Sequence, residues 1–272
     1  MGGRVPVDST LEWRDAAWWT RHLAAQRRLL NALPPGPFGR FLDVGCGMGA
    51  LGVAFHERYP EAQICAIDVD PERVAEAQAT LAERGIGAKV VRADARELPF
   101  PDGGHDVVAM ASVLHWLHPQ RERALSEAAR VLRPGGYFVL LNMIRKAGVR
   151  QFTAIVDHLA AEAASRTGVS ARALPSFDER HYSLPGLVRA LEHSSLMPIR
   201  TDSWQRRLSF ASGAAFHAFI ARTMGTFYWS DLSPDAARSY QDAFIAAVDN
   251  ARAGATFDIP VCNVIVCARR SV

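Results

Sequence analysis

Lysine is almost absent from this 272-residue chain: of its 31 basic residues, only Lys89 and Lys146 are lysines. Basic clusters are missing too, since the arginines are scattered and groupings such as Gln26–Arg28 and Gln205–Arg207 are short. Nucleic-acid-binding proteins usually carry a basic stripe or run. With a net charge of only +3, the chain is not expected to bind nucleic acid. Its arginine and alanine usage suggests a GC-rich bacterial gene.

Long apolar runs and paired cysteines are lacking as well. No uninterrupted apolar stretch approaches the roughly 18 residues of a membrane span, and the first residues lack the apolar core of a signal peptide. The four cysteines show no C-x-x-C pairing, and none of the nine histidines has H-E-x-x-H or similar spacing. We therefore expect a soluble, cytoplasmic protein with free thiols, no membrane partner and no metal.

Short apolar runs alternate with helical patterns over the first half of the chain. A helix is expected over residues 11–32, where three prolines, beginning at Pro34, end it. The alternation that follows is typical of a parallel sheet with crossover helices. The predicted strands are Arg40–Val44, Gln63–Ile67, Lys89–Arg92, Asp106–Met110 and Tyr137–Asn142, and the predicted helices are Ala50–Tyr59, Pro71–Arg84 and Gln120–Leu132.

After Asn142 the pattern becomes mainly helical. Helices are expected at Val149–Arg166, Pro185–His193, Ser212–Met224 and Pro234–Ala253, and strands at Ile199–Phe210 and Phe257–Ala268. The order predicts an α/β fold: a doubly wound, seven-stranded, mostly parallel sheet of the Rossmann-like type with an N-terminal helix and a helical cap. We divide the chain into an N-terminal helical lid (1–38), a core (39–145) and a part with the remaining strands and the cap (146–272).

The segment from Phe41 to Ala50 reads as a strand, a glycine-rich turn and a helix. Its glycines are spaced G-x-G-x-G, and Asp43 stands two residues before the first of them. Glycines let the backbone turn tightly and let a ligand approach closely. A carboxylate beside the loop gives a pyrophosphate no advantage, whereas a ligand with an ammonium and a sulfonium group tolerates or favours it.

Two further acids follow predicted strands. Asp68 ends the second strand, where a carboxylate can accept hydrogen bonds from both ribose hydroxyls. The competing role for Asp68 is a helix N-cap, but Asp70, immediately before Pro71, suits that cap better. Asp94 follows the third strand and is placed to accept a hydrogen bond from an exocyclic amine.

These segments resemble the motif series of the class I S-adenosylmethionine-dependent methyltransferases. The series runs D-V-G-C-G-x-G, I-D, A-D-A, H-D-V-V and R-V-L-R-P-G-G, in order, between Phe41 and Asn142. The resemblance implies S-adenosylmethionine as cofactor and a loop-organising role for Asp43. It further implies that the cofactor is bound by Gly45, Cys46, Gly47, Gly49, Asp68 and Val69, by Asp94 and Ala95 at the adenine, and by Ala111 at the methionine moiety.

The segment Ala111–His118 bears on the acceptor. It has no N-P-P-Y or D-P-P-Y motif, which argues against a DNA or glutamine methyltransferase. Its L-H-W sequence is similar to that of methyltransferases that esterify small carboxylates, such as the trans-aconitate and malonyl-carrier-protein group. The resemblance thus implies methyl transfer to a small molecule at oxygen, either a carboxylate or a hydroxyl.

The two kinds of oxygen need different side chains. A carboxylate needs a cationic clamp, for which Arg21, Arg206 and Arg222 are candidates. A hydroxyl benefits from a general base, for which His115 is the first candidate, although His115 could equally be a packed residue. Further candidates for substrate contact are Trp18, Trp19, His22, Trp116 and Tyr228. Secondary candidates for the base are His118, His22 and His217. For the aromatic group of Phe216, Phe227, Tyr228 and Trp229, core packing is the default interpretation.

Several alternatives remain open at this stage. One is N- or C-methylation in natural-product (secondary) metabolism, and another is a protein that binds S-adenosylmethionine without transferring its methyl group. A nicotinamide-dependent oxidoreductase is disfavoured by Asp43, by the glycine spacing and by the R-P-G-G turn. The sequence leaves a homodimer open.

Overall fold

The computed structural model describes residues 4–6, 16–145, 152–168, 177–223, 232–252 and 254–271. The chain forms two compact units. One unit contains Trp13–Ile144, Tyr182–Ser203 and Asn263–Val272, and the other contains Met1–Glu12, Arg145–His181 and Trp204–Cys262. The first unit thus combines the predicted core with two segments from later in the chain, Tyr182–Ser203 and Asn263–Val272. The predicted division placed its boundaries after residues 38 and 145 and assigned each part a continuous segment.

The strands and helices agree closely with the predicted order. The strands are β1 (Arg4–Pro6), β2 (Arg40–Val44), β3 (Gln63–Asp68), β4 (Ala88–Arg92), β5 (His105–Ala111), β6 (Leu132–Met143), β7 (Leu196–Phe210) and β8 (Phe257–Arg270). The helices are α1 (Ala16–Leu30), α2 (Ala50–Arg58), α3 (Pro71–Ala82), the 3-10 helix η1 (Leu114–Leu117), α4 (Arg121–Val131), α5 (Phe152–Thr167), α6 (Phe177–Arg180), α7 (Leu184–His193), α8 (Gly213–Thr223) and α10 (Pro234–Ala251).

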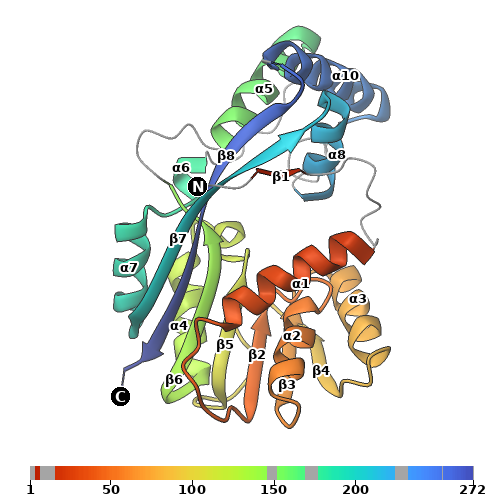
Figure 1. The fold of residues 1–272 in the computed structure, drawn as a ribbon. Helices are drawn as coiled ribbons and strands as arrows, with labels where there is room; N and C mark the ends of the chain where they lie inside the picture. Colours follow the sequence, from red (N-terminus) through yellow and green to blue (C-terminus); the bar gives the residue numbers. More distant parts are fainter. Residues whose placement is uncertain are drawn as a thin grey trace. The chain divides into compact units, whose positions relative to one another are not determined.

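The strands form one sheet in the order β1-β7-β8-β6-β5-β2-β3-β4 (Figure 1). Strands β2 to β6 pair in parallel with their neighbours, and β8 is antiparallel to β6. The predicted α/β fold is therefore confirmed. Within the described residues, the three-residue β1, which the sequence did not predict, pairs with β7 as an eighth strand.

The first unit has helices on both faces of its sheet. In Figure 1, α1, α2 and α3 lie in front of the strands and α4 lies behind them. Strand β2 is buried from Phe41 onward because both faces are covered, and the Phe41 ring stacks on Phe55 of α2 with centroids 3.9 Å apart. Helix α3 begins as predicted, with the Asp70 side chain accepting from the Glu72 amide and with Pro71 in the first turn.

The R-P-G-G turn sends the chain from α4 directly into β6. Gly135 has a φ of +72°, which favours glycine. A Cβ on Gly136 would lie 2.9 Å from the Arg133 carbonyl oxygen and 3.0 Å from that of Asp106. Strand β6 starts at Leu132, five residues before the predicted start, since Leu132 already pairs with His105 across an irregularity in the ladder.

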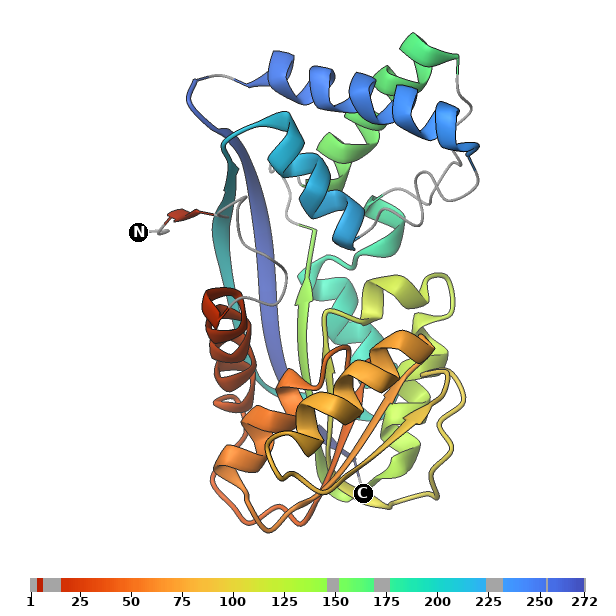
Figure 2. The same cartoon turned by 90° about the vertical axis from the view of Figure 1, so that its right-hand side faces the viewer.

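The second unit is built around three helices and its own aromatic core. Helices α5, α8 and α10 lie together in Figure 2, and α10 packs on both of the others. Phe216 of α8 is fully buried against Phe210, Phe244 and Phe257, so its predicted core role is confirmed. Residues 227–229 of the predicted aromatic group lie outside the described residues.

Candidate active site

The glycine loop joins the carboxyl end of β2 to the start of α2. The amides of Gly45 and Cys46 both donate to the Ile67 carbonyl oxygen of β3 at 2.8 Å, and Gly49 donates to the Cys46 carbonyl at 2.9 Å. The φ angles of Gly45, Gly47 and Gly49 are +73°, +52° and +84°. All three glycines therefore adopt a left-handed conformation that other residues take only with strain.

The surroundings of the three glycines differ, which the sequence does not reveal. A Cβ on Gly45 would lie 2.3 Å from Cγ2 of Val113, and one on Gly49 would lie 3.3 Å from Cα of Ala77. A Cβ on Gly47 would meet no atom within 4 Å in the part of the chain that the structure describes. Packing alone accounts for Gly45 and Gly49, whereas Gly47 borders open space into which a ligand can approach.

Asp68 connects the glycine loop to the turn after β3. Its Oδ2 accepts from the Gly47 amide at 3.0 Å, and its Oδ1 accepts from the Asp70 amide at 3.1 Å. A carboxylate has about four lone-pair positions, so each oxygen can accept a second hydrogen bond. The next residue, Val69, is 62% exposed. An acceptor for a diol and an apolar contact surface thus stand side by side at the end of β3.

Asp43 is buried behind the glycine loop. Its side chain is 1% exposed, and its Oδ2 has no hydrogen-bond partner among the described residues. Burial, with repulsion from Asp68, raises the pKa of Asp43 to about 8. A buried carboxyl group with an unsatisfied oxygen complements a cationic ligand. The site therefore fits a cofactor with ammonium and sulfonium groups, such as S-adenosylmethionine.

Cys46 lies in the loop but is not a reactive thiol. Its side chain is buried, and its Sγ lies 3.9 Å from the Gly47 carbonyl oxygen. Burial, followed by the charges of Asp43 and Asp68, raises its pKa. A thiol that stays protonated is a poor nucleophile, so the predicted contribution of Cys46 comes from its position in the loop.

Asp94 is held by a partner that the sequence analysis missed. Both of its carboxylate oxygens accept from the Arg96 guanidinium at 2.5–3.1 Å, and Oδ1 also accepts from the Arg96 amide. The bond from Arg96 lowers the pKa of Asp94. Ala95, between them, is buried. Contact of Asp94 with adenine stays a prediction, and Arg96 is positioned to orient that carboxylate.

The end of β5 leads into the segment that carries His115. Ala111 is the last residue of β5, and the Ser112 amide donates to the Leu141 carbonyl of β6 at 2.7 Å. Ser112 has a φ of +63°, an uncommon value for a residue other than glycine. Such strained backbone is often found near functional sites. Helix η1 begins two residues later.

His115 lies in η1 and is 6% exposed. Its Nδ1 is 3.1 Å from Oδ1 of Asn142, which is itself 3% exposed on β6. The Asn142 side-chain amide donates to the Met143 carbonyl oxygen at 3.0 Å. The Trp116 ring centroid is 4.5 Å from that of His115. Asn142 was not among the predicted site residues, although it is a polar residue at the end of an apolar run.

The other predicted substrate residues are more dispersed. On α1, His22 lies 3.4 Å from the Gln26 side-chain nitrogen, and burial lowers the pKa of His22. The Trp19 ring is 4.6 Å from the Arg84 guanidinium, in the turn that leads to the start of β4. Arg206 is exposed on β7 in the second unit. The side chains of Trp18, Arg21 and Arg222, and the whole of Tyr228, lie outside the described residues.

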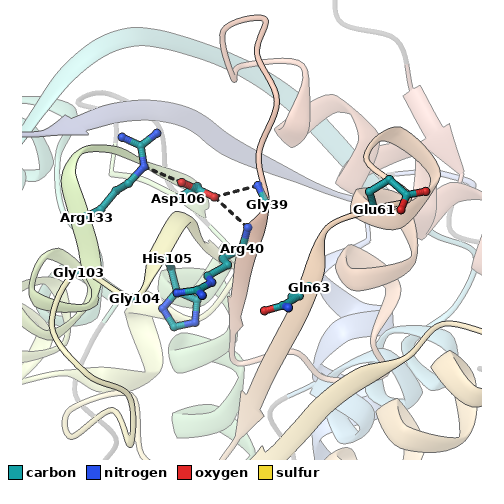
Figure 3. Close-up of a pocket in the computed structure, with 9 residues that line it drawn as sticks. All are labelled: Gly39, Arg40, Glu61, Gln63, Gly103, Gly104, His105, Asp106 and Arg133. Atoms are coloured by element: carbon teal, nitrogen blue, oxygen red, sulfur yellow. Dashed lines mark hydrogen bonds and ion pairs between the residues drawn. The ribbon is translucent and has the colours of Figure 1, made fainter.

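A cavity of about 330 Å³ lies at the amino ends of the parallel strands, at the other end of these strands from the glycine loop (Figure 3). Its lining includes Arg40, Gln63 and His105, the first residues of β2, β3 and β5. Asp106 accepts there from the amides of Gly39 and Arg40 and from Arg133 Nε, at 2.6–2.9 Å. Ligands of doubly wound sheets bind at the carboxyl ends of the strands. We therefore regard this cavity as part of a structural ion-pair network.

The described part of the chain lacks two further kinds of feature. There, no helix has both the length and the apolar character needed to cross a membrane. Across the same ranges, histidine, cysteine and acidic side chains form no group of three or more that could hold a metal ion.

Comparisons with known proteins give consistent results. A model of a methyltransferase domain matches residues 41–136. Nocamycin O-methyltransferase from Saccharothrix syringae is 32% identical over 219 residues, with 77% of each chain covered. Malonyl-[acyl-carrier protein] O-methyltransferase from Geobacter sulfurreducens is 36% identical over 131 residues, or 46% of this chain and 48% of that protein. The structure of a geranyl diphosphate methyltransferase in complex with SAM has a TM-score of 0.58 at 18% identity, covering 99% of this chain and 97% of that one.

Proposed function

Because the chain belongs to the S-adenosylmethionine-dependent methyltransferases, we propose that it methylates a small molecule at oxygen, and that this oxygen is a hydroxyl. The observation that carries the proposal is the buried, hydrogen-bonded imidazole of His115 in the segment that follows β5. A hydroxyl must lose a proton when it is methylated, and an imidazole is suited to accept it. A carboxylate needs no base. The two O-methyltransferase relatives support transfer to oxygen.

Several residues would hold the cofactor. Gly47 would lie against it, Asp68 would accept its ribose hydroxyls, and Val69 would contact its adenine with Asp94, Ala95 and Arg96 nearby. The buried carboxyl of Asp43 would release its proton when the cationic cofactor binds and would then compensate the positive charge from behind the loop, which extends the loop-organising role expected from the sequence. When bound, S-adenosylmethionine would supply a methyl group whose carbon the acceptor oxygen can attack, with the C–S bond breaking and S-adenosylhomocysteine as the leaving group.

The chain's own contribution is then alignment, exclusion of water and proton removal. Alignment of two reactants in a dry site can supply several orders of magnitude in rate. His115 would take the hydroxyl proton at its ring, while Ser112 and Val113 set the start of the segment that carries it. No cationic clamp is required for a hydroxyl, so the arginine candidates are needed only if the acceptor is a carboxylate.

The first test is binding. In thermal unfolding, S-adenosylmethionine and S-adenosylhomocysteine should stabilise the protein, by about 2.7 kcal/mol at a hundred times the dissociation constant. NADH serves as the negative control. If neither adenosyl compound shifts the transition, the cofactor assignment is wrong.

The second test is turnover. Release of S-adenosylhomocysteine is measured with panels of phenols, alcohols, small carboxylates and amines, using the wild type and His115→Ala. With a hydroxyl acceptor, the variant should lose about 10²–10⁴-fold in rate while its cofactor affinity is unchanged. Near-normal turnover of a carboxylate by His115→Ala would contradict the proposal, and binding without turnover of any acceptor would favour a non-methylating protein.

A further inference from the structure

Asn142 and His115 form a hydrogen-bond chain that determines where the imidazole carries its proton. The chain runs from the Met143 carbonyl oxygen to Asn142 Nδ2 at 3.0 Å, and from Asn142 Oδ1 to His115 Nδ1 at 3.1 Å. A carbonyl oxygen can only accept, so the nitrogen end of the Asn142 amide must face Met143. The amide oxygen then faces His115.

This orientation fixes the histidine tautomer. The Asn142 oxygen can also only accept, so Nδ1 of His115 must be the donor and must carry a hydrogen. In a neutral imidazole with a hydrogen on Nδ1, the basic lone pair belongs to Nε2. The partner that one ring nitrogen selects thus decides which nitrogen can take a proton from a substrate.

We propose that Asn142 is a positioning residue that holds His115 as the Nδ1-protonated tautomer and thereby makes Nε2 the proton acceptor. The catalytic half of this inference rests on the function proposed above, and the tautomer does not. Because the asparagine is neutral, it orients the imidazole without adding an opposite charge that would stabilise the imidazolium. Its role differs in this respect from that of a carboxylate partner.

The backbone fixes the pair in place. Strands β5 and β6 are in register up to Ala111 and Leu141, and the Ser112 amide adds a bond to Leu141 beyond the ladder. Asn142 follows immediately, and both side chains of the pair are more than nine-tenths buried. Burying a primary amide and an imidazole is unfavourable unless they are hydrogen-bonded. Each therefore favours the observed geometry of the other.

The charged groups on the neighbouring elements have partners of their own. Helix α4 packs on η1, and its first turn carries Arg121 and Glu122. Arg121 lies 4.0 Å from the Tyr182 ring centroid, and Glu122 accepts from the Tyr182 hydroxyl. The remaining titratable group close in sequence is His118, directly after η1. Along β6, the residue that faces His115 by a hydrogen bond is the uncharged Asn142.

The test is the ¹⁵N NMR spectrum of protein labelled at its histidines. Long-range ¹H–¹⁵N correlations distinguish the two neutral tautomers, and the spectrum of His115→Gln assigns the signals of His115 by their loss. At high pH, we expect Nδ1 of wild-type His115 to carry a hydrogen and Nε2 to be deprotonated. A protonated Nε2 would overturn the inference. The tautomer itself is read from the wild-type protein and requires no acceptor, and a folded His115→Gln, in which the other histidine signals are unchanged, is needed only for the assignment.

Two aspartate variants test the charge argument. In Asn142→Asp, a carboxylate at the Asn142 position should move the midpoint of the His115 titration upward by about one pH unit or more. Asn263→Asp is the matched control, because Asn263 is also buried but pairs with Met143 and so points to the other face of the sheet. An unmoved midpoint in Asn142→Asp, or an equal movement in the control, would refute the role of Asn142.

The kinetic consequence separates this inference from the proposed function. With the acceptor found in the turnover panels, Asn142→Ala should lose about tenfold or more in kcat, with the KM for S-adenosylmethionine unchanged. In Asn142→Asp, the acidic limb of the pH profile should move together with the His115 midpoint. A confirmed tautomer without turnover would contradict the proposed function alone. If turnover is found but its pH profile is the same in Asn142→Asp as in the wild type, the positioning role alone is contradicted.

Discussion

The different surroundings of the glycines predict that Gly47→Ala leaves the fold intact but weakens cofactor binding. The new Cβ would meet no atom of the described residues within 4 Å, so the cost to folding is mainly that of a left-handed alanine at a φ of +52°. This cost is about 1 kcal/mol, which corresponds to a fall in Tm of roughly 2–4 °C for a chain of this size. The methyl group would, however, occupy the space into which the cofactor must approach.

Gly85→Ala is a matched control for this variant. Gly85 has a φ of +68° and lies in the turn between α3 and β4, away from the glycine loop. Its added Cβ would also meet none of the described atoms within 4 Å. Both variants should lose about 1 kcal/mol of stability. Calorimetry with S-adenosylmethionine should show at least tenfold weaker binding for Gly47→Ala, or about 1.4 kcal/mol, and no change for Gly85→Ala. Equal affinities in the two variants would refute the assignment of the space beside Gly47 to the cofactor.

Three acidic residues give further predictions of different kinds. Asp68→Ala should weaken S-adenosylmethionine binding at least tenfold while destabilising the fold by only about 1 kcal/mol, because the two amides that it leaves are near the surface; unchanged affinity in calorimetry would count against it. Because the pKa of Asp43 is raised to about 8 from 3.8, the folded protein holds a proton that the unfolded chain releases. The free energy of unfolding should therefore fall as the pH rises from 4 to 8. Urea unfolding at several pH values should show a smaller dependence of this free energy on pH in Asp43→Asn than in the wild type. Asp106→Ala should cost about 2–3 kcal/mol in urea unfolding with normal cofactor affinity, and a loss of affinity would assign a ligand role to the cavity of Figure 3.

Local signals in the sequence predicted the fold well where they act over a few residues. The bounds of β2 and the cap of α3 agree with the structure because a strand ending in a glycine turn and an Asp-Pro pair are local features. The start of β6 was wrong by five residues, since Leu132 is drawn into the sheet by its pairing with His105, a contact between distant parts of the chain.

The sequence predicted the motifs of the site, but not which residues contact one another there. The sequence could not distinguish Gly45 from Gly47, because the distinction depends on Val113, which lies 68 positions from Gly45 in the chain and would clash with a Cβ on Gly45 but not with one on Gly47. Arg96 was missed because nothing in A-D-A-R shows that the guanidinium folds back on Asp94. Asn142 was missed because the register of β5 and β6, and not proximity in the chain, brings it to His115.

The contact between Gly45 and Val113 also limits how such an enzyme can change. Val113 touches the loop assigned to the cofactor and stands two residues before the proposed proton acceptor. A side chain of another size at this position would shift both segments at once, so cofactor affinity and acceptor chemistry share one steric constraint. Redesign for new acceptors should therefore leave Val113 unchanged and begin with residues beyond η1.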